Sequence, residues 1–263
     1  MTPAAISRLV RLLEEVLEVP LFQRNPNNLT LTAAGAAYQP GLTTMLDTLS
    51  ALTDRIKAMS DHEVLTVGVG PTFAIRWLIP RLAEFQAVEP GIDVRITTGG
   101  VEVPFGDDWT CSVTLGNGDW PGLKAEPLFT ADLTPVCQLA LADQLTTPAD
   151  LQDQTLLRVR VSHAADDWSR WFGAADTLGI VADGPEVGYY DQSLQAAIDG
   201  VGVAMGITPY INDDITAGRL IAPFGLSIPK GMQWCLIYRE ARAEEPAFTA
   251  FRDWIRLAAG VTA

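Results

Sequence analysis

The chain has 263 residues, 48% of them hydrophobic, which is enough to bury a sizeable core in one large domain or in two to three small ones. Its formal net charge is −14. Residues 1–60 hold five basic and five acidic side chains, so the whole excess lies in residues 61–263, with 13 basic against 27 acidic. Because nucleic acid is itself a dense line of negative charge, only the first sixty residues are suited to contact DNA.

The chain shows no sign of export or membrane insertion. No apolar run reaches the ~18 residues that span a bilayer, and the start does not combine a basic segment, an apolar stretch and a small-residue cleavage site. Cys111, Cys137 and Cys235 lack the spacing of a disulfide framework or a zinc site. We therefore expect a cytoplasmic protein with three reduced, buried thiols, no metal, no other cofactor and no membrane contact.

Residues 3–17 are predicted to form an amphipathic helix. Pro3 suits a first helical turn, and Thr2 is a reasonable N-cap before it. One face of this helix is apolar, and the opposite face carries Ser7, Arg8 and Arg11. The apolar residues recur at steps of three and four and share one face: Ile6, Leu9, Val10, Leu13, and Val16 or Leu17.

A hairpin and a longer helix are predicted next. The stretch "VPLFQRNPNNLTLT" has an Asn-Pro-Asn-Asn turn signal between two short strand-like runs, which is typical of a β-wing. Residues 32–59 are rich in helix formers, and we expect Pro40-Gly41 to interrupt that helix. Its apolar residues have the heptad-like spacing of a dimerising helix: Leu42, Met45, Leu46, Leu49, Leu52 and Ile56.

From residue 61 the pattern changes to strand, helix, strand. The run "EVLTVGVG" indicates a buried strand, "PTFAIRWLIPRLAEFQAVEP" an amphipathic helix and "DVRITTGG" a second strand. After "LTPVC" another alternating set extends to a closing amphipathic helix, "EPAFTAFRDWIRLAAG". This alternation predicts two α/β blocks built on parallel sheets.

Three segments resemble, in order, parts of the LysR-type transcriptional regulators, in particular the branch similar to the glycine-cleavage activator. The segment "TPAAISRLVRLLEEVLEVPLFQRNPNNLTLTAAG" resembles the recognition helix and wing of that family. The segment "LTVGVGPTFAIRWLIPRLAEFQAVEPGIDVRITT" resembles the start of its effector domain. The third match, "DDWSRWF…YYDQSLQAAIDGVGVAMG…ITAGRLIAPF", resembles its second subdomain. Together they cover almost the whole chain.

The resemblance implies an α/β fold class. A partial winged helix-turn-helix and a linker helix would precede a two-lobed, periplasmic-binding-protein-like effector domain with hinged α/β sheets. The chain would cross between the lobes near Thr134–Val136 and Trp234–Ile237. The expected boundaries are 1–35 for the recognition helix and wing, 36–60 for the linker and dimerisation helix, 61–135 with 236–263 for lobe I, and 136–235 for lobe II.

Family members carry roughly thirty residues before the recognition helix, which form the first and the positioning helix of the motif. Against that pattern we expect this chain to be truncated at the recognition helix, either through a start codon assigned too late or as a natural remnant. About five apolar side chains of residues 3–17 would then stay exposed to water, and each would forgo roughly 1.5–3 kcal/mol of stabilisation by burial. The segment is expected to fray or to dock elsewhere.

By the resemblance, the face with Ser7, Arg8 and Arg11 would meet DNA, where Arg is suited to bidentate contacts with guanine or phosphate. The wing is poor in Lys and Arg, which makes its electrostatic contribution weak. The candidate DNA-binding residues are Thr2, Pro3, Ser7, Arg8, Arg11, Arg24, Asn27, Thr30 and Thr32.

The resemblance also implies a small-molecule site between the lobes, at the strand ends where ligands of open α/β sheets collect. The alternative for each candidate is a packing or capping role, and Asp191 is a natural N-cap for "QSLQAAIDG". The candidate ligand-binding residues are Pro71, Thr72, Phe73, Thr97, Thr98, Gly99, Asp166, Asp167, Trp168, Tyr190, Asp191 and Gln192.

Catalytic chemistry has little support in the sequence. The "GVG" that ends at Gly70 is not a full dinucleotide fingerprint. His62 and His163 have no nucleophile or carboxylate at the spacing of a triad. We therefore expect no enzyme.

Two further groups of residues are expected to have structural roles. The pairs Asp166-Asp167 and Asp213-Asp214 point apart on a helix, which favours helix-start caps or solvated acids. Trp77, Trp168 and Trp171 are expected in the core or in a pocket wall.

The expected function is transcriptional regulation by a DNA-binding homodimer or homotetramer that responds to a small metabolite bound between the lobes. The alternative is a truncated effector-binding or dimerising protein without autonomous DNA binding. A solute-binding protein of the same shape would need a signal peptide and no wing. The sequence leaves open the operator, activation or repression, and whether the effector is an amine or an anion such as an amino acid or carboxylate.

Overall fold

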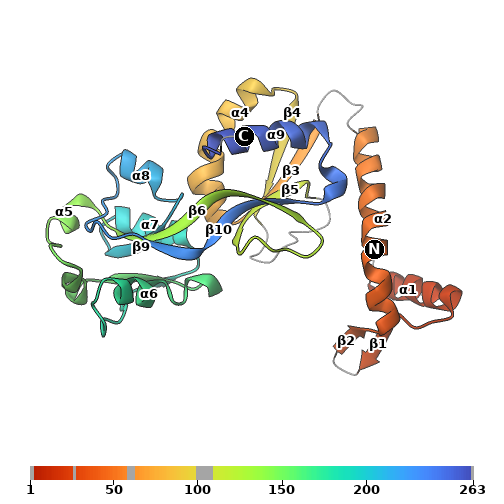
Figure 1. The fold of residues 1–263 in the computed structure, drawn as a ribbon, viewed down its shortest axis with the longest axis horizontal. Coiled ribbons are helices and arrows are strands. Elements are labelled where there is room, and N and C mark those ends of the chain that lie inside the picture. The colour runs from red at the N-terminus through yellow and green to blue at the C-terminus, as the bar shows by residue number, and fades with distance from the viewer. Residues whose placement is uncertain (1–2, 26–27, 58–62, 99–108, 262–263) are drawn as a thin grey trace. The chain divides into compact units, whose positions relative to one another are not determined.

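A computed structural model of the protein describes residues 3–25, 28–57, 63–98 and 109–261. The chain divides into two compact units, Met1–Lys57 and Ala58–Ala263. Figure 1 labels the helices and strands of each unit. No helix within the described residues is both long and apolar enough to cross a bilayer.

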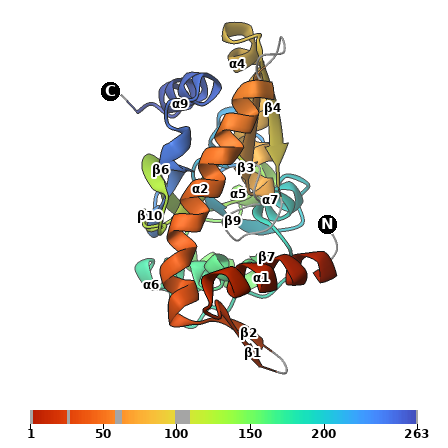
Figure 2. The ribbon, with the colours of Figure 1, turned by 90° about the vertical axis from the view of Figure 1, so that its right-hand side faces the viewer.

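The N-terminal unit is a helix, a hairpin and a long second helix. Helix α1 (Pro3–Leu17) starts at the proline predicted for its first turn. Strands β1 (Phe22–Asn25) and β2 (Asn28–Leu31) pair antiparallel, which confirms the predicted wing. Helix α2 (Ala33–Lys57) follows at once, and Figure 2 shows α1 crossing near the end of α2 from which the hairpin extends.

The side chains of Glu14 and Thr32 join the wing to the two helices through hydrogen bonds with backbone groups. One carboxylate oxygen of Glu14 on α1 accepts bonds from the amides of Leu21 (2.8 Å) and Phe22 (3.0 Å) at the start of the wing. The hydroxyl of Thr32 caps α2, since it accepts a bond from the Gly35 amide at 3.0 Å. The same hydroxyl donates to the carbonyl of Pro20 at 2.7 Å. The wing is thereby fixed to both helices.

Pro40-Gly41 does not interrupt α2, contrary to the prediction. The helix continues through Pro40 to Lys57. A proline removes one backbone donor, and the carbonyl it leaves free, that of Ala36, belongs to an exposed residue, so water can satisfy it. The hydroxyl of Thr44 donates to the Pro40 carbonyl at 3.0 Å in the next turn.

The C-terminal unit is built on one eight-stranded sheet with the order β4-β3-β5-β10-β6-β9-β7-β8. Strands β4, β3 and β5 are parallel at one end of the sheet, and β9, β7 and β8 are parallel at the other. The strands are β3 (Glu63–Val69), β4 (Ile92–Thr97), β5 (Cys111–Gly116), β6 (Lys124–Val136), β7 (Leu156–Val159), β8 (Glu186–Val187), β9 (Val203–Ile207) and β10 (Ile228–Tyr238). The two predicted parallel α/β blocks are therefore present.

We name the two ends of this sheet, with their helices, lobe I and lobe II. Lobe I adds to its strands α3 (Pro71–Phe73), η1 (Ala74–Leu78), η2 (Ile79–Arg81), α4 (Leu82–Val88), η5 (Glu240–Arg242) and α9 (Pro246–Ala258). Lobe II adds α5 (Leu139–Ala142), η3 (Pro148–Asp153), η4 (Ser162–Ala164), α6 (Asp167–Ala174), α7 (Tyr190–Ile198) and α8 (Asn212–Thr216). The long strands β6 and β10 run from one lobe into the other, as Figure 1 shows.

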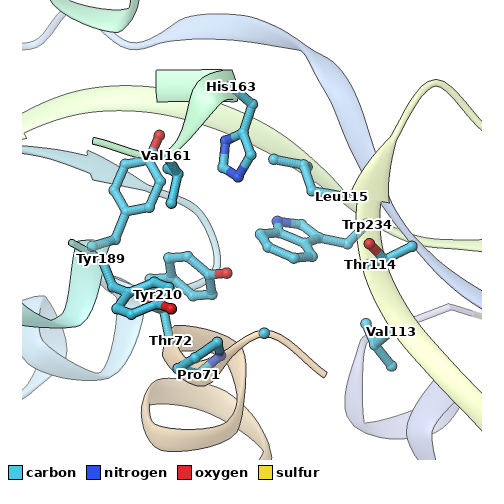
Figure 3. Close-up of a pocket in the computed structure, with 12 residues that line it drawn as sticks. Pro71, Thr72, Val113, Thr114, Leu115, Val161, His163, Tyr189, Tyr210 and Trp234 are labelled. Carbon is cyan, nitrogen blue, oxygen red and sulfur yellow. The ribbon is translucent and has the colours of Figure 1, made fainter. Parts of the chain in front are cut away.

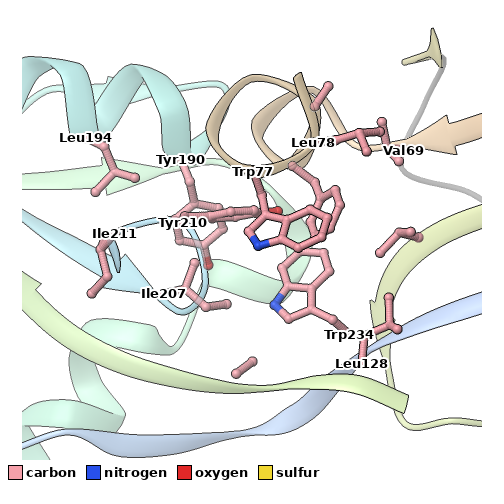
Figure 4. Packing of buried hydrophobic residues seen from close by; sticks show 14 of the residues in the cluster. Val69, Trp77, Leu78, Leu128, Tyr190, Leu194, Ile207, Tyr210, Ile211 and Trp234 are labelled. Atoms are coloured by element: carbon pink, nitrogen blue, oxygen red, sulfur yellow. The ribbon is translucent and has the colours of Figure 1, made fainter. Parts of the chain in front are cut away.

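The core combines aliphatic and aromatic side chains, and part of it lies where the lobes meet (Figure 4). Phe73 is fully buried, with its ring 5.1 Å from that of Trp77 and 5.3 Å from that of Trp234. Trp77, Trp168 and Trp171 are all buried, which confirms their predicted core role. The three cysteines are free and buried, also as predicted.

Candidate functional site

A cleft opens between the lobes at the ends of their parallel strands (Figure 3). The empty space between its walls is about 570 Å³ when the open solvent at its mouth is counted. The described residues that line it come from both lobes and from the strand that crosses between them: Gly70, Pro71, Thr72, Val113, Thr114, Leu115, Val161, His163, Tyr189, Tyr190, Tyr210 and Trp234.

Three of the predicted ligand-binding residues line this cleft: Pro71, Thr72 and Tyr190. The structure brings the first two from the start of the helical segment after β3 and the third from the start of α7. Phe73 points instead into the core. Trp168 is buried, and its indole N–H donates to the carbonyl of Leu157 at 3.0 Å.

The other predicted positions lie around the cleft or beyond it. Thr97 ends β4 and the exposed Thr98 follows it, and neither lines the cleft. Gly99 lies outside the described residues. Asp166 is exposed, and its carboxylate does not cap α6.

Asp191 is not the N-cap of α7, contrary to the prediction. The helix begins one residue earlier, at Tyr190, and the side-chain oxygen of Gln192 accepts bonds from the amides of Gly188 (2.9 Å) and Tyr189 (3.3 Å). The carboxylate of Asp191 is then available to lobe I, where it accepts a bond from the hydroxyl of Thr72 at 2.9 Å.

Asp167 belongs to a buried ionic cluster behind the cleft wall. The ammonium of Lys230 donates to the carboxylate of Asp167 and, at 2.6 Å, to the carbonyl of His163. The hydroxyl of Tyr190 donates to the same carboxylate at 2.5 Å. Burial and the negative Asp167 raise the pKa of Tyr190, so its phenol stays protonated.

A second set of charges joins the lobes directly. The guanidinium of Arg76 in lobe I donates to the buried carboxylate of Asp214 at 2.7 Å and to the carbonyl of Asp191 at 3.0 Å. Arg81 makes a bidentate contact with Asp213, with both distances 2.8 Å. We call the contacts of Thr72, Arg76 and Arg81 with Asp191, Asp213 and Asp214 the interlobe bridge.

These contacts correct the interpretation of the aspartate pairs. Asp167, Asp213 and Asp214 form ion pairs with Lys or Arg side chains and are not helix-start caps or solvated acids. Arg76, Arg81 and Lys230 lie more than sixty residues from their partners, so no local spacing could have indicated those pairs, whereas Arg219, which also pairs with Asp214, is only five residues away. No group of three or more potential metal ligands gathers in the part of the chain that the structure describes.

The predicted DNA-binding residues lie on α1 and the wing. Ser7, Arg8 and Arg11 are exposed on α1, and Thr30 is exposed on β2. Thr32 is half-buried because its hydroxyl caps α2. Pro3 begins α1 and Arg24 lies on β1, opposite Leu29 in the hairpin register, while Thr2 and Asn27 lie outside the described residues.

Comparison with known proteins decides the family. Residues 60–259 match the model of the LysR substrate binding domain, and residues 1–36 match the bacterial regulatory helix-turn-helix protein of the lysR family. The chain belongs to the LysR family of transcriptional regulators.

Similar LysR-type proteins include two characterised activators. The chain is 38% identical to the HTH-type transcriptional activator AmpR of Pseudomonas aeruginosa over 100% of its own length and 88% of that protein. It is 36% identical to the glycine cleavage system transcriptional activator of Escherichia coli, over 97% of its own length and 84% of the relative. This LysR-type chain is therefore a transcriptional regulator with an effector-binding domain.

Solved structures agree with this assignment. The effector domain of AmpR from Pseudomonas aeruginosa covers 75% of this chain and 95% of its own, with 36% identity and a TM-score of 0.64. CrgA of Neisseria meningitidis, a LysR-type regulator, covers 99% of this chain and 90% of its own, with a TM-score of 0.61. At 21% identity, CrgA supports the fold alone.

Sequence reasoning missed several residues at the cleft of this LysR-type regulator, above all His163, Tyr210 and Trp234. Two of them follow a strand, and that position is a sequence signal that could have identified them. His163 follows the strand β7, and Tyr210 follows β9 in the run "GITPY". Trp234 lies within β10, so only the three-dimensional path of that strand places it at the cleft.

Proposed function

We propose that this LysR-type regulator binds DNA through α1 and the wing and binds a small metabolite in the interlobe cleft. The metabolite changes the angle between the lobes and so changes how an oligomer presents its DNA-binding helices. The observation that carries this proposal is that both lobes contribute to one cleft, so a ligand there contacts both and can favour one arrangement over another. We propose no catalytic role, and we propose the cytoplasm, where the DNA lies, as its location.

The interlobe bridge supports the same proposal. Its contacts hold the lobes together beside the cleft, while β6 and β10 connect them through the sheet. We retain as part of the proposal the division into lobe I, residues 61–135 with 236–263, and lobe II, residues 136–235. A linker helix at residues 36–60 would join the protomers of a homodimer or homotetramer.

A specific observation favours a second candidate, an effector-binding or dimerising protein without autonomous DNA binding. Leu9, Leu12 and Val16 of α1 are 54%, 48% and 80% exposed. A recognition helix uses such side chains to pack on its partner helices. On the same helix, the carboxylate of Glu14 accepts hydrogen bonds from the amides of Leu21 and Phe22 at the start of the wing.

A salt-controlled binding assay with the DNA upstream of the protein's own gene separates the two candidates. If α1 reads DNA, Arg8→Ala with Arg11→Ala weakens binding and reduces the slope of log affinity against log salt by about 1 for each lost phosphate contact. Arg95→Ala is the matched control, since Arg95 is an exposed arginine of lobe I that pairs with Asp93. No specific binding by the unmodified chain supports the second candidate.

A further inference from the structure

We infer that the cleft takes an uncharged ligand built on a flat ring, held by stacking and by neutral hydrogen bonds. This inference rests on the proposed role of the cleft as the effector site. It goes beyond that role because it names the chemistry of the ligand, which the sequence left open between amines and anions.

The first observation is that the described residues of the cleft lining include no acidic or basic side chain other than the histidine His163. None of the twelve described residues that line it is Asp, Glu, Lys or Arg. A carboxylate or ammonium that leaves water for such a site loses its hydration, and that loss is recovered only by pairing and hydrogen bonding inside. None of the described lining residues could form an ion pair with a charged group of a ligand.

Three of the acidic side chains outside the lining are already paired with cations. Asp167 pairs with Lys230, Asp213 with Arg81, and Asp214 with both Arg76 and Arg219. The place that an anion would take at the start of α7 is occupied by the carboxylate of Asp191, bonded to Thr72. A ligand anion would meet this negative charge.

The second observation is a wall of rings on the cleft. The rings of Tyr210 and Trp234 lie 5.0 Å apart, and those of Tyr190 and Tyr210 lie 6.1 Å apart. The imidazole of His163 stacks on Tyr190 at 5.9 Å with an interplanar angle of 15°. Figure 3 shows His163, Tyr210 and Trp234 facing the same space. Aromatic faces of this kind favour a flat ring over a small aliphatic amino acid.

The third observation is an unused hydrogen-bonding atom on that wall. The Nδ1 atom of His163 is buried, and no described group bonds to it. Buried polar atoms are usually paired, so an orphan at a cleft indicates a partner that arrives with the ligand. Burial and the neighbouring Lys230 lower the pKa of His163, so the ring it offers at neutral pH is uncharged.

Three probes of nearly one shape test the inference: benzamide, benzoate and benzamidine are neutral, anionic and cationic. Binding to the full chain is followed by tryptophan fluorescence and by calorimetry. We expect benzamide to bind with a Kd of about 1 mM or lower and at least tenfold more tightly than either charged probe. Equal or tighter binding of benzoate or benzamidine, or no binding of benzamide at about 10 mM, overturns the inference.

Two variants separate the imidazole's chemistry from its packing. His163→Leu is expected to weaken benzamide binding about tenfold, while His163→Gln, which keeps a neutral hydrogen-bonding group, is expected to stay within about threefold. Equal losses in both variants overturn the role given to His163. If the unmodified chain binds benzamide but shows no specific DNA binding, the proposed function is contradicted. The inference about the ligand of the cleft is then still supported.

Discussion

At the scale of single residues, Lys230 forms a buried ion pair with Asp167. Its side chain is 1% exposed and the carboxylate of its partner Asp167 is 2% exposed. Lys230→Met would leave that carboxylate buried without a cation, so we expect the free energy of unfolding to fall by about 3–5 kcal/mol. Urea denaturation at neutral pH measures the change.

Lys124→Met is the matched control for this prediction. Lys124 pairs with Glu240 on the surface, with side chains 53% and 78% exposed, and such pairs contribute about 0–1 kcal/mol. If the two variants lost the same stability, the burial of the Lys230–Asp167 pair would have no energetic consequence. Adding Asp167→Asn to Lys230→Met is expected to restore part of the loss, because the unpaired charge is removed.

His163, also a single residue, makes the stability of the C-terminal unit depend on pH. Burial, the first cause, and the charge of Lys230 lower its pKa in the folded chain, while the nearby Asp167 partly opposes them. Below about pH 6.5 the unfolded chain therefore binds a proton that the folded chain resists, and stability falls as the pH falls. His163→Gln is expected to remove up to about 1.4 kcal/mol per pH unit of this slope between about pH 6.5 and 5. A slope unchanged by the substitution would contradict the prediction.

At the scale of elements, the joint between the wing and α2 depends on Gly35. A Cβ atom at this position would lie 2.2 Å from the carbonyl oxygen of Leu21, whereas one at Gly41 in the same helix would meet nothing within 4 Å. We expect Gly35→Ala to destabilise the N-terminal unit by about 1–3 kcal/mol and Gly41→Ala to stabilise it by up to about 1 kcal/mol. Amide hydrogen exchange at Leu21 and Phe22 reports both changes.

The elements of this protein were largely predictable because each depends on local chemistry. The spacing of apolar residues on α1, the turn signal of the wing and the glycine exits of β3 and β4 all act within a few residues. The prediction of a helix break at Pro40 was wrong because the rest of the helix compensates for the proline. The local cost of a proline inside a helix is about 3 kcal/mol, and the rest of the 25-residue helix α2 outweighs it.

The interlobe bridge connects elements that the sequence separates by more than a hundred residues. Arg81→Asp would set two carboxylates against each other at Asp213, and the swap with Asp213→Arg would restore an opposite pair. Because Arg81 and Asp213 are 23% and 44% exposed, we expect a coupling energy of about 0.5–1 kcal/mol. Distances between spin labels in the two lobes should broaden in the single variant and recover in the swap. A swap that does not recover them would exclude this pair from holding the lobes.

At the scale of the whole molecule, the cleft shows why sites are harder to predict than folds. Pro71, Thr72 and Tyr190 were identified because ligands collect at the ends of parallel strands. Trp234 reaches the cleft only because β10 runs through both lobes. Lys230 lies behind the cleft wall because the same strand carries it to Asp167. Such positions depend on the path of the whole chain, which no local pattern contains.

The apolar stripe on α2 carries the last prediction. Met45, Leu49 and Leu52 are 72%, 60% and 51% exposed at heptad-like spacing, a pattern that is buried when two such helices pair. Each leucine buried in a dimer contributes roughly 1.5–3 kcal/mol, so Leu49→Lys with Leu52→Lys is expected to raise the dimer Kd at least about 100-fold. Sedimentation across concentrations measures the shift.

Thr43→Lys, an exposed position on the opposite face of α2, supplies the control and should leave the dimer intact. If protomers must pair to read two half-sites together, the double lysine variant also loses DNA affinity at concentrations where it is monomeric, and regains it as the concentration rises. A variant that stays dimeric would place the interface elsewhere on the chain. One that is monomeric yet binds DNA as tightly as the unmodified chain would show that each helix α1 reads its site alone.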